Sequence, residues 1–272
     1  MPDPSKPLWL HQERELGIYV ATPVHSDVSI HYTQSLLEFQ KACMEKGIKV
    51  MFEMIKSSLV TQGRNLCTAS FLKSEMSHML FIDSDIAFSS DSIWSMLEAD
   101  KDVISVPYPL KDIKFDRLIQ KILHGDVTTA HEAHVNCNTY PLRLEDSEAI
   151  EIEGDGVIEV THAPTGCMLI KREVFDTLIE AYPHMEIHQE SLIDGKLQKK
   201  PYLYNFFDTY YDQENKRFLG EDFAFCRLWR NTGGKCYCYI MDYITHVGEF
   251  QYTGRLWDEM KPSSVDTPDK SR

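Results

Sequence analysis

Apolar residues fall along the chain in two alternating kinds of segment. Residues 17–24 (GIYVATPV) form a continuous apolar run with β-branched residues, which predicts a buried strand that stops at Pro23. The segment that follows spaces its apolar residues as one helix face through Ile30, Leu36, Leu37 and Met44. Ser26 or Asp27 is its expected N-cap and Gly47 its stop. Residues 48–54 (IKVMFEM) alternate as a strand does, so these segments together predict a β-α-β unit.

The same alternation continues through the rest of the chain. It predicts further strands over residues 78–83, 102–109, 157–163, 167–171 and 235–250, and further helices over 62–74, 89–100, 112–123, 172–182 and 220–234. Strands that alternate with helices at this spacing favour right-handed crossovers and strands of one direction. We therefore predict an α/β fold with a mixed, mostly parallel sheet flanked by helices. In such sheets ligands bind at the carboxyl ends of the strands.

One domain accounts for this pattern. The chain has 272 residues, 43% of them hydrophobic, which is enough to bury a sizeable core, and no internal repeat or low-complexity linker divides it. We expect the domain over residues 15–257, an N-terminal extension at 1–14 and a disordered tail at 258–272. The polar, irregular stretch 111–156 lies within the domain. We interpret it as a mobile flap or an acceptor loop.

The sequence shows no sign of a membrane or secretory segment. No window reaches the roughly 18 to 20 apolar residues of a membrane span, and the N-terminal residues lack the basic-then-apolar layout of a signal peptide. The seven cysteines are an odd number and form no C-x-x-C pair, which indicates reduced structural thiols. Cys236 and Cys238 share one face of a predicted strand, as small buried residues would. We expect a cytoplasmic protein without a transmembrane segment.

The net charge narrows the class of partner. At −14, the chain repels polyanions, so we expect no nucleic-acid partner. A substrate that carries phosphate groups would need a divalent cation between itself and this acidic chain. That requirement draws attention to the carboxylates that stand at strand ends.

Two aspartates directly follow an apolar strand. In HMLFIDSDIAFSS, residues 78–90, Asp83 and Asp85 stand at the end where an α/β sheet binds its ligands. Carboxylates at the end of a buried strand are costly to desolvate unless a positive group meets them, and a metal ion would be such a group. Alternatively, the two aspartates cap the loop that leads into the helix at 89–100.

The residues described so far resemble the GT-A class of nucleotide-sugar-dependent glycosyltransferases. The resemblance rests on FIDSD after a strand, GED at the opening of a helix and a histidine after the last strands, and it covers roughly residues 15–255. Residues 61–93 (TQGRNLCTASFLKSEMSHMLFIDSDIAFSSDSI) are similar to Anp1/Mnn9-like proteins and to virus- and phage-encoded members. In those proteins an Arg-Asn pair precedes the Asp-x-Asp motif.

The resemblance implies a Rossmann-like GT-A domain with a defined chemistry. It implies that Mn²⁺ or Mg²⁺ assists sugar transfer from a nucleoside-diphosphate sugar, UDP- or GDP-linked, to a hydroxyl of a glycan or other acceptor. The implied metal ligands are Asp83, Asp85 and His246. The implied donor-binding residues are Thr22, Pro23, Val24, Arg64, Asp83 and Lys111. Asp222 would be the general base of an inverting transfer, with Glu221 beside it.

Each of these roles has a structural alternative. Glu221 and Asp222 could simply stabilise the start of the helix they open. His246 is a lone histidine, a type of residue that often has a purely structural role. Arg64 could lie on the surface of its helix instead of positioning a phosphate or an aspartate.

Other functions remain open at this point. A metal-dependent nucleotidyltransferase usually carries a glycine-rich phosphate loop after its first strand, and VATPVHSD has no glycine there. A nucleotide-sugar hydrolase could use the same carboxylates with water as the acceptor. The alternative from another class is an inactive, GT-A-like binding protein that keeps the fold.

Overall fold

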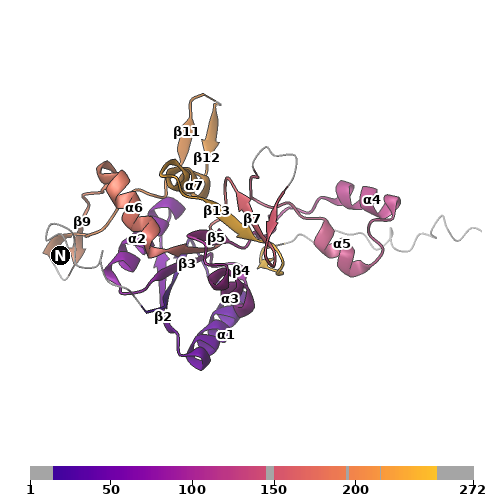
Figure 1. Ribbon diagram of the computed structural model, residues 1–272, viewed down its shortest axis with the longest axis horizontal. Helices are drawn as coiled ribbons and strands as arrows, with labels where there is room; N and C mark the ends of the chain where they lie inside the picture. The colour runs from indigo at the N-terminus through magenta and orange to yellow at the C-terminus, as the bar shows by residue number, and fades with distance from the viewer. Residues whose placement is uncertain (1–14, 145–149, 194–195, 215, 250–272) are drawn as a thin grey trace, which may run out of the picture.

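The computed structural model describes residues 15–144, 150–193, 196–214 and 216–249. An eight-stranded sheet in the order β2-β1-β3-β8-β5-β13-β7-β6 runs through it (Figure 1). Its strands are β1 Gly17–Val24, β2 Lys49–Lys56, β3 His78–Ile82, β5 Val103–Ser105, β6 Ile152–Glu153, β7 Val157–Val160, β8 Cys167–Lys171 and β13 Cys236–Tyr239. Within this sheet, β8 and β7 run antiparallel to both of their neighbours. The sheet is therefore mixed and most of its strands share one direction, as predicted.

Helices flank this sheet, and the described residues also form three short two-stranded sheets. The helices are α1 Ile30–Lys46, α2 Val60–Lys73, α3 Ser90–Glu98, α4 Phe115–His124, α5 Ala130–Asn136, α6 Arg172–Ala181 and α7 Glu221–Asn231, with a 3₁₀ turn, η2, at Pro183–Met185. The small sheets pair β9 Glu190–Ile193 with β10 Lys196–Lys199, β11 Tyr210–Asp212 with β12 Arg217–Leu219, and β4 Ile86–Ala87 with β14 Thr245–His246. Strand β14 lies in the segment 235–250 that was predicted as strands, whereas β4, β6, β9 to β12, α5 and η2 were not predicted.

Alternation along the central strands builds a core on each face of the sheet. Ile18 and Val20 of β1 pack with buried residues of α1 and α3, whereas Tyr19 and Ala21 of the same strand pack with those of α2, α6 and α7. This period of two is what a strand buried on both faces requires. The continuous apolar run that predicts β1 thus reflects a sheet that helices cover on both faces.

Helix α1 differs from its prediction in its start and in the face that it buries. Ser29, rather than Ser26 or Asp27, is the N-cap, and its side chain accepts a hydrogen bond from the His31 N–H. The helix ends as predicted at Gly47, whose φ of 67° lies in the left-handed region that glycine adopts at low cost. The buried residues of the helix are Tyr32, Ser35, Leu36, Phe39 and Cys43.

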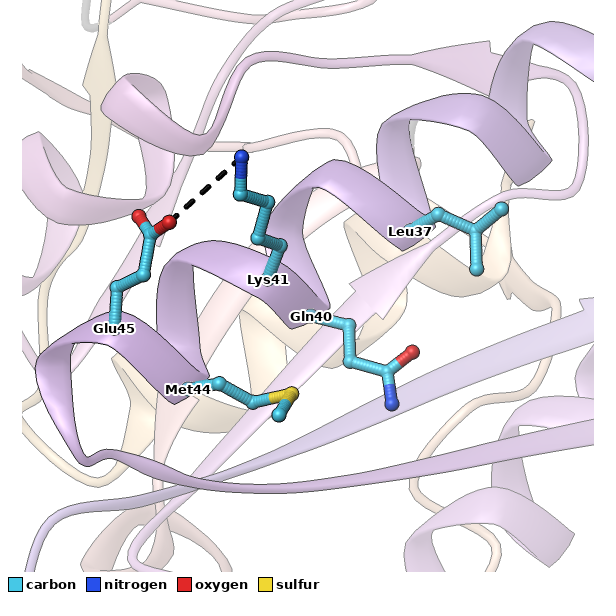
Figure 2. Close-up of a pocket in the computed structure, with 5 residues that line it drawn as sticks. All are labelled: Leu37, Gln40, Lys41, Met44 and Glu45. Carbon is cyan, nitrogen blue, oxygen red and sulfur yellow. Dashed lines mark ion pairs between the residues drawn. The ribbon is translucent and has the colours of Figure 1, made fainter.

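The predicted apolar face of α1 is wrong for three of its four residues. Leu36 is buried, but Leu37 and Met44 are 61% and 73% exposed, and Ile30 is exposed as well. Figure 2 shows Leu37 and Met44 with Gln40 on the outer side of the helix, beside the ion pair between Lys41 and Glu45. Residues 32, 36, 39 and 43, which recur at helical spacing, form the core-facing side of the helix instead.

The region interpreted as a flap contains two helices that extend from one end of the molecule (Figure 1). Helix α4 overlaps the helix predicted at 112–123, starting three residues later and ending one residue later. Helix α5 begins with a capping box in which the Thr129 and Glu132 side chains satisfy each other's backbone N–H groups. We call residues 111–140, which include both helices, the flap.

The cysteines agree with their prediction as structural thiols, because all seven are free and buried. In the part of the chain that the structure describes, no helix is long and apolar enough to cross a membrane. The predicted extension at 1–14, the predicted tail at 258–272 and the last part of the predicted domain, 250–257, lie outside the described residues. The cytoplasmic location stays a prediction.

Candidate active site

The pairing of β14 with β4 brings His246 to Asp85. His246 lies opposite Ile86 in this antiparallel pair, and the next residue, Val247, donates its N–H to the Asp85 carbonyl at 2.8 Å. His246 Nε2 then lies 3.4 Å from Asp85 Oδ2. Its Nδ1 lies 2.9 Å from the Pro109 carbonyl oxygen, which holds the ring in place. Two residues that the sequence grouped only by resemblance are thus neighbours.

Lys111 reaches the same carboxylate oxygen from the start of the flap. Its Nζ lies 2.6 Å from Asp85 Oδ2. Burial alone would raise the pKa of Asp85, but the hydrogen bonds from His246 and Lys111 hold it at about 2. Asp85 is therefore an ionised carboxylate that faces two basic groups.

Arg64 is buried at the centre of the site, not on the surface of its helix. Only 2% of the residue is exposed. Its Nη2 donates to Asp83 Oδ1 at 2.9 Å, and its Nε donates to Glu221 Oε1 at 3.2 Å. Although burial opposes the charge of the guanidinium, the charges of Asp83 and Glu221 raise the pKa of Arg64 above its usual value. Arg64 is therefore a positive group of the chain itself that compensates the charge of Asp83.

Asn65, the partner of Arg64 in the Arg-Asn pair, fixes the segment that leads towards α7. Its Oδ1 accepts a hydrogen bond from the Phe207 N–H at 2.9 Å, and its Nδ2 donates to the Phe207 carbonyl at 3.0 Å. Nδ2 also lies 3.0 Å from Asn205 Oδ1. No role was predicted for Asn65, because its hydrogen-bond partners lie far along the chain.

Asp222 occupies the first turn of α7, beside Glu221. The N-cap of this helix is Gly220, which has no side chain to accept a hydrogen bond, and Asp222 Oδ1 accepts from the Phe223 N–H at 2.8 Å. Burial and the neighbouring charge of Glu221 raise the pKa of Asp222 to about 6. Glu221 binds Arg64, whereas Asp222 is a carboxylate with the affinity for a proton that a general base needs.

Tyr108 is a site residue that the sequence analysis missed. Its ring meets that of His246 edge to face, with 5.0 Å between the ring centroids. Burial and the charge of Asp83 raise the pKa of Tyr108, so its hydroxyl stays protonated. A Cβ built on Gly166 would lie 2.3 Å from Tyr108 Cε1, which means that the ring occupies the space of a side chain at position 166. No local pattern in the sequence indicates this contact.

The predicted donor-binding residues at the end of β1 are buried. Thr22 Oγ1 lies 2.6 Å from Tyr32 Oη, and this pair is closed off from solvent. Pro23 packs against α2, where a Cβ on Gly63 would lie 3.1 Å from Pro23 Cβ. Val24 is also buried. Their contact with a nucleotide stays a prediction.

The site offers few side-chain donor atoms for the predicted metal ion. Among the described residues, no group of three or more His, Cys, Asp or Glu side chains is placed to hold a metal ion. Asp83 is engaged by Arg64, and the pair that converges is Asp85 with His246. One carboxylate and one imidazole suit Mn²⁺, and Mg²⁺ or Mn²⁺ at nucleotide sites commonly takes its other ligands from phosphates and water. The residues present therefore fit such an ion if a diphosphate completes the shell.

No protein-family profile and no curated protein sequence matches this chain. The Anp1/Mnn9-like subtype accordingly stays a prediction. Similar folds do occur among solved structures. A197 from STIV is 14% identical with a TM-score of 0.41, and the match covers 88% of this chain and 98% of that one.

Two further solved structures have folds similar to that of this chain. A glycosyltransferase involved in the glycosylation of the major capsid of PBCV-1 is 9% identical with a TM-score of 0.31, over 59% of this chain and 62% of that one. GalNAc-T7, determined with UDP, GalNAc and Mn²⁺, is 10% identical with a TM-score of 0.41, over 89% of this chain and 45% of that one. The similar folds also include a UDP-glucose pyrophosphorylase complexed with UDP-glucose. Likeness at this level assigns no ligand, metal or reaction to the chain.

Proposed function

We propose that this protein is a metal-dependent glycosyltransferase that moves a sugar from a nucleoside-diphosphate sugar to a hydroxyl acceptor. The observation that carries the proposal is the convergence of two charged groups of residues after β3. Asp83 joins Arg64 and Glu221, and Asp85 joins Lys111 and His246. The motif is thus built into a network of acids and bases at the ligand-binding edge of the sheet, which a loop cap does not require.

Asp85 and His246 are the proposed metal ligands. When bound, Mn²⁺ or Mg²⁺ supplies a Lewis acid that neutralises the charge of the leaving diphosphate. Lys111 shares Asp85 Oδ2 with His246, so it is placed to exchange that carboxylate for a donor phosphate. We assign Asp83 and Arg64 to positioning, because the guanidinium orients both Asp83 and Glu221.

Asp222 is the proposed general base. It takes the proton of the acceptor hydroxyl as that oxygen bonds to the anomeric carbon, while the bond from this carbon to the diphosphate breaks. A pKa of about 6 leaves Asp222 mostly ionised near neutral pH yet basic enough to accept the proton. Attack from the face opposite the leaving group inverts the configuration. UDP and GDP are both candidate nucleotides of the donor.

Calorimetry of nucleoside diphosphate binding tests the proposal. We expect UDP or GDP to bind in Mn²⁺ and to lose affinity in EDTA, and we expect Asp85→Ala to abolish the effect of the metal. Asp91→Ala is the matched control, because Asp91 is an exposed aspartate at the start of α3. Equal affinity of both nucleotides in Mn²⁺ and in EDTA would contradict the metal-dependent function.

A further inference from the structure

A space of about 580 Å³ lies between the flap and residues 242–249. Its size falls within the roughly 300 to 1,000 Å³ of small-molecule sites. Lys111 and His246 line it, and both contact Asp85, so the space borders the proposed metal ligands. Lys111 is also a predicted donor-binding residue, whereas the other members of that predicted set do not line the space: Thr22, Pro23, Val24, Arg64 and Asp83. The space is therefore beside the reaction centre, and of the predicted donor-binding residues it meets Lys111 alone.

Aromatic rings line this space and remain accessible. Phe115 and Tyr140 of the flap are exposed, and Tyr243 on the opposite side is 72% exposed. His131 meets Tyr243 across the space, with 5.8 Å between ring centroids and 3.4 Å between Nε2 and Tyr243 Oη. Exposed rings gathered at one hollow are a feature of ligand-binding grooves. Their flat, electron-rich faces suit the apolar C–H face of a sugar ring.

Three carboxylates and an amide contribute acceptors of hydrogen bonds to the space. Asp112, Asp242 and Glu249 are carboxylates on its lining, and Asn138 adds an amide. Within the described residues, Asp242 Oδ2 is buried and has no hydrogen-bond partner, which is uncommon for such an atom. Carboxylate oxygens on the lining can accept hydrogen bonds from the hydroxyl groups of a sugar.

The charge around the space disfavours an anionic ligand. The lysine on its lining, Lys111, is paired with Asp85, and no arginine among the described residues lines the space. Asp112 is itself paired with Lys114, whereas the carboxylates of Asp242 and Glu249 would repel a phosphorylated or carboxylated sugar. Rings, carboxylates and an amide together select a neutral, hydroxyl-rich ligand.

We propose that this space binds a neutral sugar unit of the acceptor glycan. The proposal rests on the proposed function, because it takes the reaction to be sugar transfer. The flap then binds the acceptor, while the chain around β1 and α2 binds the nucleotide. A sugar stacked on Tyr243 is held beside His246 and Lys111, next to the proposed metal ligands.

Ligand-observed NMR with simple sugars tests this assignment. The probes are the methyl glycosides of glucose, galactose, mannose and N-acetylglucosamine at millimolar concentration, each measured alone and with UDP plus Mn²⁺. We expect at least one of them to bind the full-length protein and Tyr243→Ala to raise its Kd about tenfold or more, which corresponds to about 1.4 kcal/mol. Leu37→Ala is the control, since Leu37 is an exposed apolar residue of the open hollow on α1 (Figure 2).

The outcomes separate this proposal from the proposed function. If no neutral glycoside binds in either condition, or if binding survives Tyr243→Ala and Phe115→Ala unchanged, the acceptor site lies elsewhere. Displacement of the glycoside by a UDP-sugar but not by UDP would assign the space to the sugar of the donor and overturn the proposal. Metal-dependent nucleotide binding is measured independently by calorimetry. If calorimetry detects no such binding while a glycoside still binds near Tyr243, the sugar site stands and the proposed transferase function is rejected. The melting temperatures of Tyr243→Ala and Phe115→Ala are expected to match that of the native protein. Matching values exclude misfolding as the cause of lost binding.

Discussion

The Arg64 guanidinium joins Asp83 to Glu221, with Nη2 2.9 Å from Asp83 Oδ1 and Nε 3.2 Å from Glu221 Oε1. Asp83 follows β3 and Glu221 opens α7, so one side chain connects the first half of the chain to the helix that carries the proposed base. An arginine is suited to this because its fork presents several donors in a fixed plane.

Removal of Arg64 should destabilise the fold. In Arg64→Met, Asp83 and Glu221 lose their common partner, and breaking a buried ion pair in this way costs about 3–5 kcal/mol of unfolding free energy. Both carboxylates keep some access to water, which places the expected loss at the lower end of that range. Urea denaturation measures the loss. Arg117→Met, a change at an exposed arginine of α4, is the control; equal urea midpoints for the two variants would contradict the structural role of Arg64.

Activity should rise with pH through the ionisation of Asp222. Since only the ionised carboxylate accepts a proton, kcat/KM is expected to increase as the pH passes about 6. Asp222→Asn should remove that rise and lower kcat by roughly 10² to 10⁴-fold, with donor binding nearly unchanged. Asp91→Asn, in the first turn of α3, is the control for helix electrostatics. Near-native turnover by Asp222→Asn, or a product that keeps the anomeric configuration of the donor, would rule out Asp222 as the inverting base.

The same residue should make the protein less stable as the pH rises. The pKa of Asp222 is about 6 in the folded chain and has an ordinary value of 3.8, so the folded state binds the proton more tightly. Its contribution to stability is therefore present below about pH 4 and is lost as the pH rises to about 6. Asp222→Asn should melt above the native protein at pH 7 and close to it at pH 4. A variant that melts lower at pH 7 would show that the carboxylate is stabilising.

Replacement of Lys111 should strengthen metal binding in the absence of nucleotide. Its ammonium group and a divalent ion both require Asp85 Oδ2, so Lys111→Met frees a ligand for Mn²⁺. Mn²⁺ titration by calorimetry measures the gain. Lys114→Met is a matched control, because Lys114 pairs with Asp112 in the flap rather than with Asp85. Weaker Mn²⁺ binding by Lys111→Met would contradict the competition.

His246→Ala should weaken Mn²⁺ binding more than it disturbs the fold. Loss of even an outer partner of a metal ligand commonly costs 10- to 100-fold in affinity, and we expect a loss of about this size or more for a direct ligand. His246 also contacts Tyr108 and the Pro109 carbonyl, so some decrease in melting temperature is expected. If Mn²⁺ titrates normally while the melting temperature falls by several degrees, the role of His246 is structural.

Gly166→Ala should be destabilising through Tyr108. The added methyl group would overlap the Tyr108 ring, and overpacking of this kind costs about 1–3 kcal/mol. In a Tyr108→Ala background the same change should cost much less, because the ring is gone. A double-mutant cycle by urea denaturation measures the coupling. Additive effects would show that the ring moves aside without cost.

Local patterns in the sequence were sufficient for most elements of the fold. The apolar run of β1 and the helical spacing in α2 report directly which residues are buried, so both elements appear where they were predicted. The strand order depends on contacts between distant segments. β8 inserts between β3 and β5 and runs antiparallel to both, although it follows β7 in the sequence. The failure at α1 has a similar origin, because a helix with apolar residues on two faces does not reveal which of them meets the sheet.

The candidate site was predictable only in part for the same reason. Asp83 and Asp85 could be identified as candidate site residues from their place at a strand end. GED and His246 could be identified only from the resemblance to a known family. The bonds from Arg64 to Glu221 and from Asn65 to Phe207 join segments far apart in the sequence, and no periodicity records them. The contact of Tyr108 with Gly166 likewise depends on how two loops meet.

The exposed residues Ile30, Leu37 and Met44 recur every seven positions along the outer side of α1 and will influence how the protein behaves in concentrated solution. At neutral pH the net charge of −14 keeps molecules apart despite this apolar stripe. Added salt shortens the range of that repulsion to about 10 Å at 0.1 M, and acid removes it by protonating carboxylates. Turnover and melting measurements below pH 6 are therefore best made with dilute protein at low ionic strength, so that colloidal precipitation is not mistaken for unfolding or for loss of activity.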